Sequence, residues 1–340
     1  MDVLLSIPLI SYLVAPTQTS WSASFNLLFF YMTWATLILS HSALKVQLVG
    51  VLAIRIVLWL VPSLLSLLLD LGLPSVMESI KHGGRASLPL RNARRIGRLL
   101  FMVIVNNAVL LGVEGLISYA YLNTYGQTIF RTTLTLPFPW QVAKQIVYLF
   151  ILRETLQYYL HRHVLHSSDS PVAKLHTSFA HGPAGAPFAL QVYTDHPVPL
   201  LLHRFLPIYL PAAFIRPHLL TYFLFVGLCT LEETLAMSGY TIVPGIIMSG
   251  ITQRTAIHYA TKGNANYGAY GVVDWAHSTS KGRGILQDLR DEAEKHHLQE
   301  RSERTVGQGL EAMKSGISAV LSSGSDEAKP EKRAKRGSKK

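Results

Sequence analysis

The sequence predicts an all-α fold, a multi-pass integral membrane helical bundle with a histidine-lined site on its cytosolic side. Only 15% of the 340 residues are charged, whereas a soluble domain has roughly 25%. Apolar runs of membrane length recur along the chain, and basic segments lie beside them. The polar residues between these runs include many histidines.

The first half of the chain contains three long apolar runs. Residues 22–40 and 46–74 are long enough to cross a bilayer, since about 20 helical residues span its core. A third run covers 99–121 and contains Glu114. Residues 3–15 are apolar but shorter, which predicts an anchor or an interfacial helix.

Two further segments complete the predicted bundle. Residues 140–160 lead back across the membrane, after a polar turn that contains prolines. Residues 199–236 are apolar but are interrupted at Arg216-Pro217. This interruption predicts a helical hairpin with Arg216 at its tip.

Charge predicts the orientation. Residues 81–98 carry six Lys or Arg and no acid, and basic segments beside apolar spans normally stay in the cytosol. Counting crossings from there places 161–198 and 250–280 on the same cytosolic face. The net charge of +11 is also compatible with a protein that binds nucleic acid. Because the basic residues are mostly juxtamembrane, we expect no nucleic-acid partner.

The chain divides into three predicted parts. Residues 1–80 form N-terminal membrane helices, 81–282 form the main membrane domain, and 283–340 form a charged helical and disordered cytosolic tail. A single cysteine, Cys229, excludes an internal disulfide and a cysteine-type zinc site. No Gly-x-Ser-x-Gly motif supports a hydrolase.

The histidines are concentrated in the predicted cytosolic segments. Five of the fourteen fall within 161–181, a sixth is His196, and His258 follows far downstream. On a regular helix His163 and His166 would share a face, whereas His161 and His166 would point about 140° apart. Imidazole is a common ligand of iron and zinc. Each histidine alone suits an interfacial hydrogen bond, but together they predict a metal site.

Several short motifs resemble the fatty acid hydroxylase/sterol desaturase superfamily, especially its fungal-type members. In order along residues 85–282 they are YYLHR, LH, DHP, ET with SGY, NYG and DW. The resemblance implies an endoplasmic reticulum protein with about four membrane helices and a cytosolic di-iron centre. Such proteins hydroxylate or desaturate lipids with molecular oxygen.

The resemblance also implies the metal ligands, although the histidine boxes are depleted. Ala180, Met237 and Tyr259 stand where the family has histidines. Glu154, Asp195 or Glu233 could add oxygen ligands, because carboxylates also suit iron. The histidines that match the boxes or their neighbourhood are His161, His166, His176, His181, His196 and His258.

Two functions are therefore expected. The first is a membrane-bound non-haem iron oxidoreductase that acts on a lipid, sterol or hydrophobic secondary metabolite and takes electrons from cytochrome b5 or a reductase. The alternative is a degenerate relative that isomerises or binds a hydrophobic molecule without redox metal. Asp195 and Glu233 are the candidate catalytic residues. Glu232 and Glu233 could instead be paired with Arg204 or Arg254.

Overall fold

The computed structural model describes residues 21–167, 170–181, 187–243 and 245–282. Within these ranges the chain is helical and contains isolated bridges but no named strand, which confirms the predicted all-α class. The chain divides into two compact units, Met1–Ile285 and Leu286–Lys340, and every described residue belongs to the first. The predicted anchor at 3–15 and the tail at 283–340 lie outside the described residues, and the division at residue 80 stays a prediction.

Among the described residues, four helical segments are long and apolar enough to cross a membrane, which confirms a multi-pass protein. The first joins α4 (Ala43–Arg55), the π-helical turn η2 (Ile56–Leu60) and α5 (Val61–Gly72). The second is α7 (Ala93–Tyr125). The side chains of Ser42 and Asn92 accept hydrogen bonds from the first turns of α4 and α7, and a left-handed Gly126 ends α7.

The other two spans form the predicted hairpin. Its first arm joins α10 (Pro197–Leu200), the π turn η6 (Leu201–Phe205) and α11 (Leu206–Ile215), and its second arm is α12 (Leu219–Ser238). Arg216 lies at the tip in the left-handed conformation, with a φ of 51°, and donates to the carbonyls of Thr128 and Ile129. The predicted position of Arg216 is therefore confirmed.

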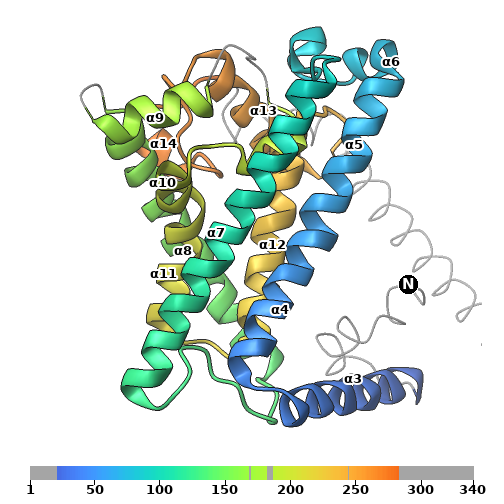
Figure 1. Ribbon diagram of the computed structural model, residues 1–340, viewed down its shortest axis with the longest axis vertical. Coiled ribbons are helices and arrows are strands. Elements are labelled where there is room, and N and C mark those ends of the chain that lie inside the picture. Colours follow the sequence, from blue (N-terminus) through green and yellow to red (C-terminus); the bar gives the residue numbers. More distant parts are fainter. Residues whose placement is uncertain (1–20, 168–169, 182–186, 244, 283–340) are drawn as a thin grey trace, which may run out of the picture. The chain divides into compact units, whose positions relative to one another are not determined.

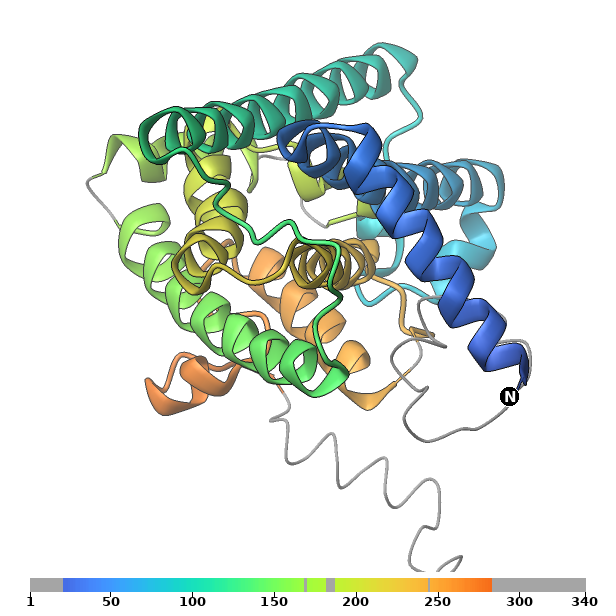
Figure 2. The same ribbon diagram turned by 90° about the horizontal axis from the view of Figure 1, so that it is seen from below.

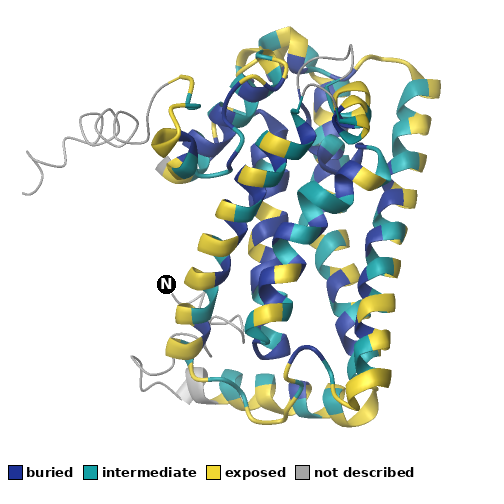
Figure 3. Ribbon diagram, turned by 90° about the vertical axis from the view of Figure 1, so that its left-hand side faces the viewer, coloured by how far each residue is buried: buried dark blue, intermediate teal, exposed yellow. Residues whose placement is uncertain are grey.

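α12 is the central helix of the bundle. Of its membrane-length window 72% is buried, compared with 22% for each of the spans at 43–72 and 93–125. Seen from the α3 end, α12 is surrounded by the other long helices, including α8 (Pro139–Leu160) (Figure 2). Exposed residues recur along the outer helices, as Figure 3 shows by colour. Many of them are large and apolar, which suits contact with lipid.

The first predicted crossing is wrong in its placement. α3 (Trp21–Ser40) lies across one end of the bundle in Figure 1 instead of running alongside the other spans. Its Trp34 is buried there, donates to the carbonyl oxygen of Thr133 over 3.0 Å and packs on His218. Length and hydropathy could not reveal this contact between α3 and two distant loops.

The opposite end of the bundle carries the short polar helices. α6 (Pro74–Ser79), α9 (Pro171–Phe179), α13 (Ile246–Ala260) and α14 (Val272–Ala276) gather there (Figure 1). The 3-10 turn η3 (Gly84–Ser87) follows α6 and leads to α7, and η5 (Ala189–Tyr193) lies between α9 and α10. The long helices alternate in direction, so residues 161–198 and 250–280 share an end with 81–98, as crossing counts predicted.

A buried carboxylate joins three of the spans, and its partner on α12 lies in the first turn of that helix. Glu114 on α7 accepts hydrogen bonds at Oε1 from Gln47 of α4 over 2.9 Å and from Tyr222 of α12 over 3.0 Å. An uncompensated charge is costly inside a membrane, so these donors stabilise the packing of three helices. The other end of α12 is held by the buried Lys81–Asp70 ion pair, whose carboxylate also accepts from Tyr240 over 2.8 Å.

Close packing of α4 on α12 generates a prediction about stability. A Cβ added to Gly50 would come within 2.3 Å of the Phe223 ring, so Gly50→Ala should destabilise the bundle by about 1–3 kcal/mol. Gly112→Ala on α7 is the control, because no atom lies within 4 Å of its new Cβ. Thermal unfolding in detergent measures both variants. Equal melting temperatures for both would contradict the α4–α12 contact.

Candidate metal centre

A π-helical turn brings the first two histidines together. α8 continues into η4 (His161–Leu165), where the amide of His166 donates to the carbonyl of His161 over 3.1 Å, five residues back. This wider turn places His161 and His166 on one face, with their Nε2 atoms 3.2 Å apart. The expectation from a regular helix is therefore wrong. His163 is exposed and stacks on Tyr159 instead.

The next two histidines come from α9 and the turn that follows it. Ser170 caps α9 by accepting from the amide of Val172. His176 is buried in the last turn of this helix. The rings of His176 and His181 are 5.0 Å apart, and the His166 ring lies 5.1 Å from His176 and 5.0 Å from His181.

Two further histidines complete the cluster. His258 on α13 lies 4.6 Å from His161 and 4.9 Å from His181, between ring centroids. His203 on η6 lies 4.1 Å from His161, and sequence reasoning left it outside the site. One feature of the sequence could have identified His203: it lies beside Arg204 near the end of an apolar span, where polar residues are usually functional.

The ligand atoms of four histidines converge most tightly. One nitrogen from each of His161, His166, His176 and His181 lies within 4.8 Å of the other three. Imidazole groups that approach so closely suit iron, zinc or copper. We name the six rings the histidine cluster: His161, His166, His176, His181, His203 and His258.

Hydrogen bonds to Nδ1 fix the orientation of three rings. The Nδ1 atoms of His161 and His258 lie 2.9 Å and 2.7 Å from the carbonyl oxygens of Tyr267 and Ala265. The Nδ1 atom of His176 lies 2.5 Å from a carboxylate oxygen of Asp195. Because a carbonyl can only accept, Nδ1 of His161 and of His258 carries the proton and Nε2 keeps its lone pair. Metal-binding histidines commonly show this arrangement.

Two cluster nitrogens are buried without a hydrogen-bond partner. They are Nε2 of His176 and Nδ1 of His181. Buried polar atoms normally have partners, because an unpaired one costs free energy. A metal ion would coordinate such a lone pair, so the residues present fit a resident metal.

Burial keeps three rings of the cluster neutral. Removal from water, together with neighbouring histidines, lowers the pKa of His166 to about 2 and holds that of His161 well below its usual range. Burial likewise lowers the pKa of His258 to about 4. Histidine binds metal in its neutral form, so these rings can act as ligands at neutral pH without losing a proton.

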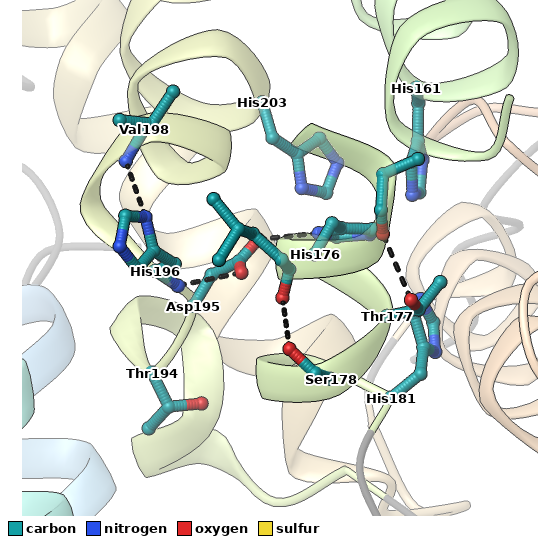
Figure 4. Close-up of polar contacts among 12 residues, drawn as sticks. His161, His176, Thr177, Ser178, His181, Thr194, Asp195, His196, Val198 and His203 are labelled. Carbon is teal, nitrogen blue, oxygen red and sulfur yellow. Dashed lines mark hydrogen bonds and ion pairs between the residues drawn. The ribbon is translucent and has the colours of Figure 1, made fainter. Parts of the chain in front are cut away.

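His196 is not brought into the cluster. In Figure 4 it lies on the other side of Asp195 from His176. Its Nδ1 accepts from the amide of Val198 over 3.3 Å, and its ring packs on Phe179. It therefore caps the short helix α10, and its predicted ligand role stays a prediction without geometric support.

The carboxylates at the end of α12 are held by arginines. Arg153 donates from Nη1 to both oxygens of Glu232, at 3.0 and 2.8 Å, and from Nη2 to Glu233. Arg204 pairs with the same Glu233 oxygen over 3.1 Å, as anticipated. Tyr270 also donates to Glu232 over 2.6 Å. This layer of paired charges lies against the histidine cluster and shares a cavity with it.

Two other acids hold the loop that supports His161. The carboxylate of Asp274 accepts from the amides of Tyr267 and Gly268, at 2.9 and 2.7 Å. Glu154 accepts from the amides of Ala269 and Tyr270. These contacts explain the NYG and DW motifs, since they fix the Tyr267 carbonyl that orients His161. Glu154 thus binds the loop rather than joining the cluster.

The cluster opens into a cavity of about 530 Å³, its open side included. Ala236, Met237 and Ile251 give it an apolar wall, whereas the histidines, Thr255 and Tyr259 are its polar part. Met237 and Tyr259 therefore line the cavity at positions where the resembling family has ligands, while Ala180 is half-buried and lies outside this lining. An apolar wall thus lies next to the candidate metal ligands.

Comparison with known proteins agrees with this geometry. A family model described as fatty acid hydroxylase matches residues 146–279, which contain the whole histidine cluster. Residues 146–279 are thus similar to the fatty acid hydroxylase family, in agreement with the motifs that resemble the fatty acid hydroxylase/sterol desaturase superfamily. It is 28% identical over 225 residues to methylsterol monooxygenase 2-2 of Arabidopsis thaliana, a match that covers 63% of this chain and 79% of the relative. No solved structure matches significantly.

The geometry of the histidine cluster predicts that His203, but not His196, contributes to iron affinity. His203→Ala should lower iron affinity at least about tenfold, because it removes a ring beside His161. His196→Ala should retain iron, because that ring lies outside the cluster. Iron titration of the purified full-length variants, with metal content by mass spectrometry, measures both. Loss of iron in His196→Ala with retention in His203→Ala would contradict the cluster.

Proposed function

We propose that this protein is a membrane-bound non-haem iron hydroxylase or desaturase of a lipid, sterol or similar hydrophobic metabolite. The observation that carries this proposal is the convergence of four imidazole nitrogens within 4.8 Å of one another, beside a partly apolar cavity. Iron at the cluster would supply oxygen activation, as resemblance to the family implies. The relative is a methylsterol monooxygenase, which supports a lipid or sterol as substrate class.

The protein's own residues would have three tasks. The cluster rings hold iron through nitrogens whose tautomers are fixed by Tyr267, Ala265 and Asp195. Asp195 is then a positioning residue that keeps Nε2 of His176 directed at the metal. Met237 and Ile251 offer an apolar surface to the substrate and exclude water from it.

Glu233 would act through charge in this scheme. Its carboxylate is shared by Arg153 and Arg204, and this pairing keeps a charged layer stable at the end of α12. The layer lines the same cavity as the histidines, so it can orient a polar group of the substrate there. A direct catalytic role of Glu233 remains the prediction made from the sequence.

Membrane residence and the electron source complete the proposal. The basic segment 81–98 and the cluster lie at one end of the bundle, which favours a cytosolic site if basic segments stay inside. We propose the endoplasmic reticulum membrane as its location, with cytochrome b5 or a reductase as donor. The ratio of iron to protein separates a one-ion from a two-ion site.

A product comparison tests the proposed reaction. Cells that express the wild-type chain should accumulate a hydrophobic metabolite that has gained one oxygen atom or lost two hydrogens. His176→Ala should abolish this product, because it removes a central ligand. Lipid extracts analysed by high-resolution mass spectrometry measure the change. The same oxidised product from His176→Ala and from wild type would contradict the ligand role of His176, whereas a new product of unchanged oxidation state would favour the non-redox alternative.

Asp195→Asn is the matched variant, because it keeps every ring of the cluster. It loses only the charge that holds Nδ1 of His176, so iron affinity should fall by about 10–100-fold. Added iron should then restore the product in Asp195→Asn but not in His176→Ala. If added iron restores neither variant, Asp195 does more than position His176.

A further inference from the structure

A second groove lies between the start of α7 and the end of α9. Its volume is about 1070 Å³, open side included. No residue lines both this groove and the histidine cavity, so the two are separate. The groove is lined by Leu88, Pro89, Leu90, Arg95, Ile96, Arg98, Leu99, Met102, Ser178, Phe179, Ala180, Phe188, Gln191 and Thr194.

The charge of this groove is uncompensated. Its lining contains Arg95 and Arg98 but no Asp or Glu. No ion pair within the described part of the chain involves either arginine. Because they are three residues apart on one helix, they share a face and can contact the same anion. Two guanidinium groups side by side favour a phosphate, to which each can donate paired hydrogen bonds.

The remainder of the groove is mainly apolar. Leu99 and Met102 follow the arginines along α7, in the direction in which that helix continues as a membrane span. Phe179 and Phe188 also line the groove. Beyond it, exposed Phe101 and Ile104 on the same helix suit contact with acyl chains. A small soluble anion would leave this apolar lining without a partner.

We propose that this groove binds an anionic membrane phospholipid. The headgroup phosphate contacts Arg95 and Arg98, and an acyl chain lies over Leu99 and Met102 toward the bilayer. Positive side chains at a membrane surface attract anionic lipid, and here they adjoin an apolar wall that fits the chain. The lipid would lie next to Ser178 and Ala180, which are sequence neighbours of the cluster residues His176 and His181.

Native mass spectrometry of the full-length protein tests this inference. The protein, purified in neutral detergent, is incubated with phosphatidylglycerol or with phosphatidylcholine of the same chains. Wild type should retain phosphatidylglycerol preferentially. The double variant Arg95→Gln, Arg98→Gln should bind it about tenfold more weakly. Arg94→Gln is the matched control for the single variant Arg98→Gln, because each removes one charge from an exposed position of the same helix and only Arg98 lines the groove.

Other outcomes decide against the inference without depending on that variant. Equal retention of both lipids by wild type would overturn it, as would displacement of phosphatidylglycerol by inorganic phosphate, which would indicate an ion site. Equal losses in Arg94→Gln and Arg98→Gln would show a general charge effect and overturn the inference. The double lysine variant, Arg95→Lys with Arg98→Lys, keeps the charge and should keep most of the preference. Thermal unfolding of each variant in detergent shows whether the fold persists.

Discussion

The site depends on one departure from regular helical geometry. His161 and His166 are five residues apart and would diverge on an α-helix, but the π turn η4 places their Nε2 atoms 3.2 Å apart. The extra residue interrupts the regular hydrogen bonds of the helix. The loop at 266–270 supports His161 there, because the Tyr267 carbonyl accepts from Nδ1 of its ring. Without this turn, the histidines of α9 and α13 would meet only one of the two rings, His161 or His166, instead of both.

A second π turn performs a similar task on the facing helix. η6 carries His203 toward His161 while its neighbour Arg204 reaches Glu233. Buried ion pairs contribute little net stability by themselves, since desolvation opposes their attraction. Their value here is geometric: Arg153 and Arg204 join α8 and η6 to the end of α12 and so fix the helices that carry the rings.

The sequence predicted the helical class, the hairpin with Arg216 at its tip, and the gathering of 161–198 and 250–280 at one end, because apolar length and basic charge are local properties. The sequence did not predict the features that depend on contacts between residues far apart in the chain. α3 lies across the bundle because Trp34 meets Thr133 and His218. His163 was favoured over His161 as a neighbour of His166 because a π turn leaves no simple pattern in the residues.

The same limit explains the two differences in the candidate site. His196 matched a family motif, yet its ring caps α10 by accepting from the amide of Val198. His203 matched no box, yet it adjoins His161. Motif spacing describes neighbours along the chain, whereas the cluster collects its rings from η4, α9 with the turn after it, η6 and α13.

The central claim is that these imidazoles hold iron together. X-ray absorption at the iron edge of the purified, iron-loaded full-length protein tests it most directly. We expect a first shell dominated by nitrogen, with the outer-shell scattering that several imidazole rings produce, and its loss in His161→Ala. Iron that fails to bind wild type, or binds with an oxygen-only shell without imidazole scattering, would contradict the claim.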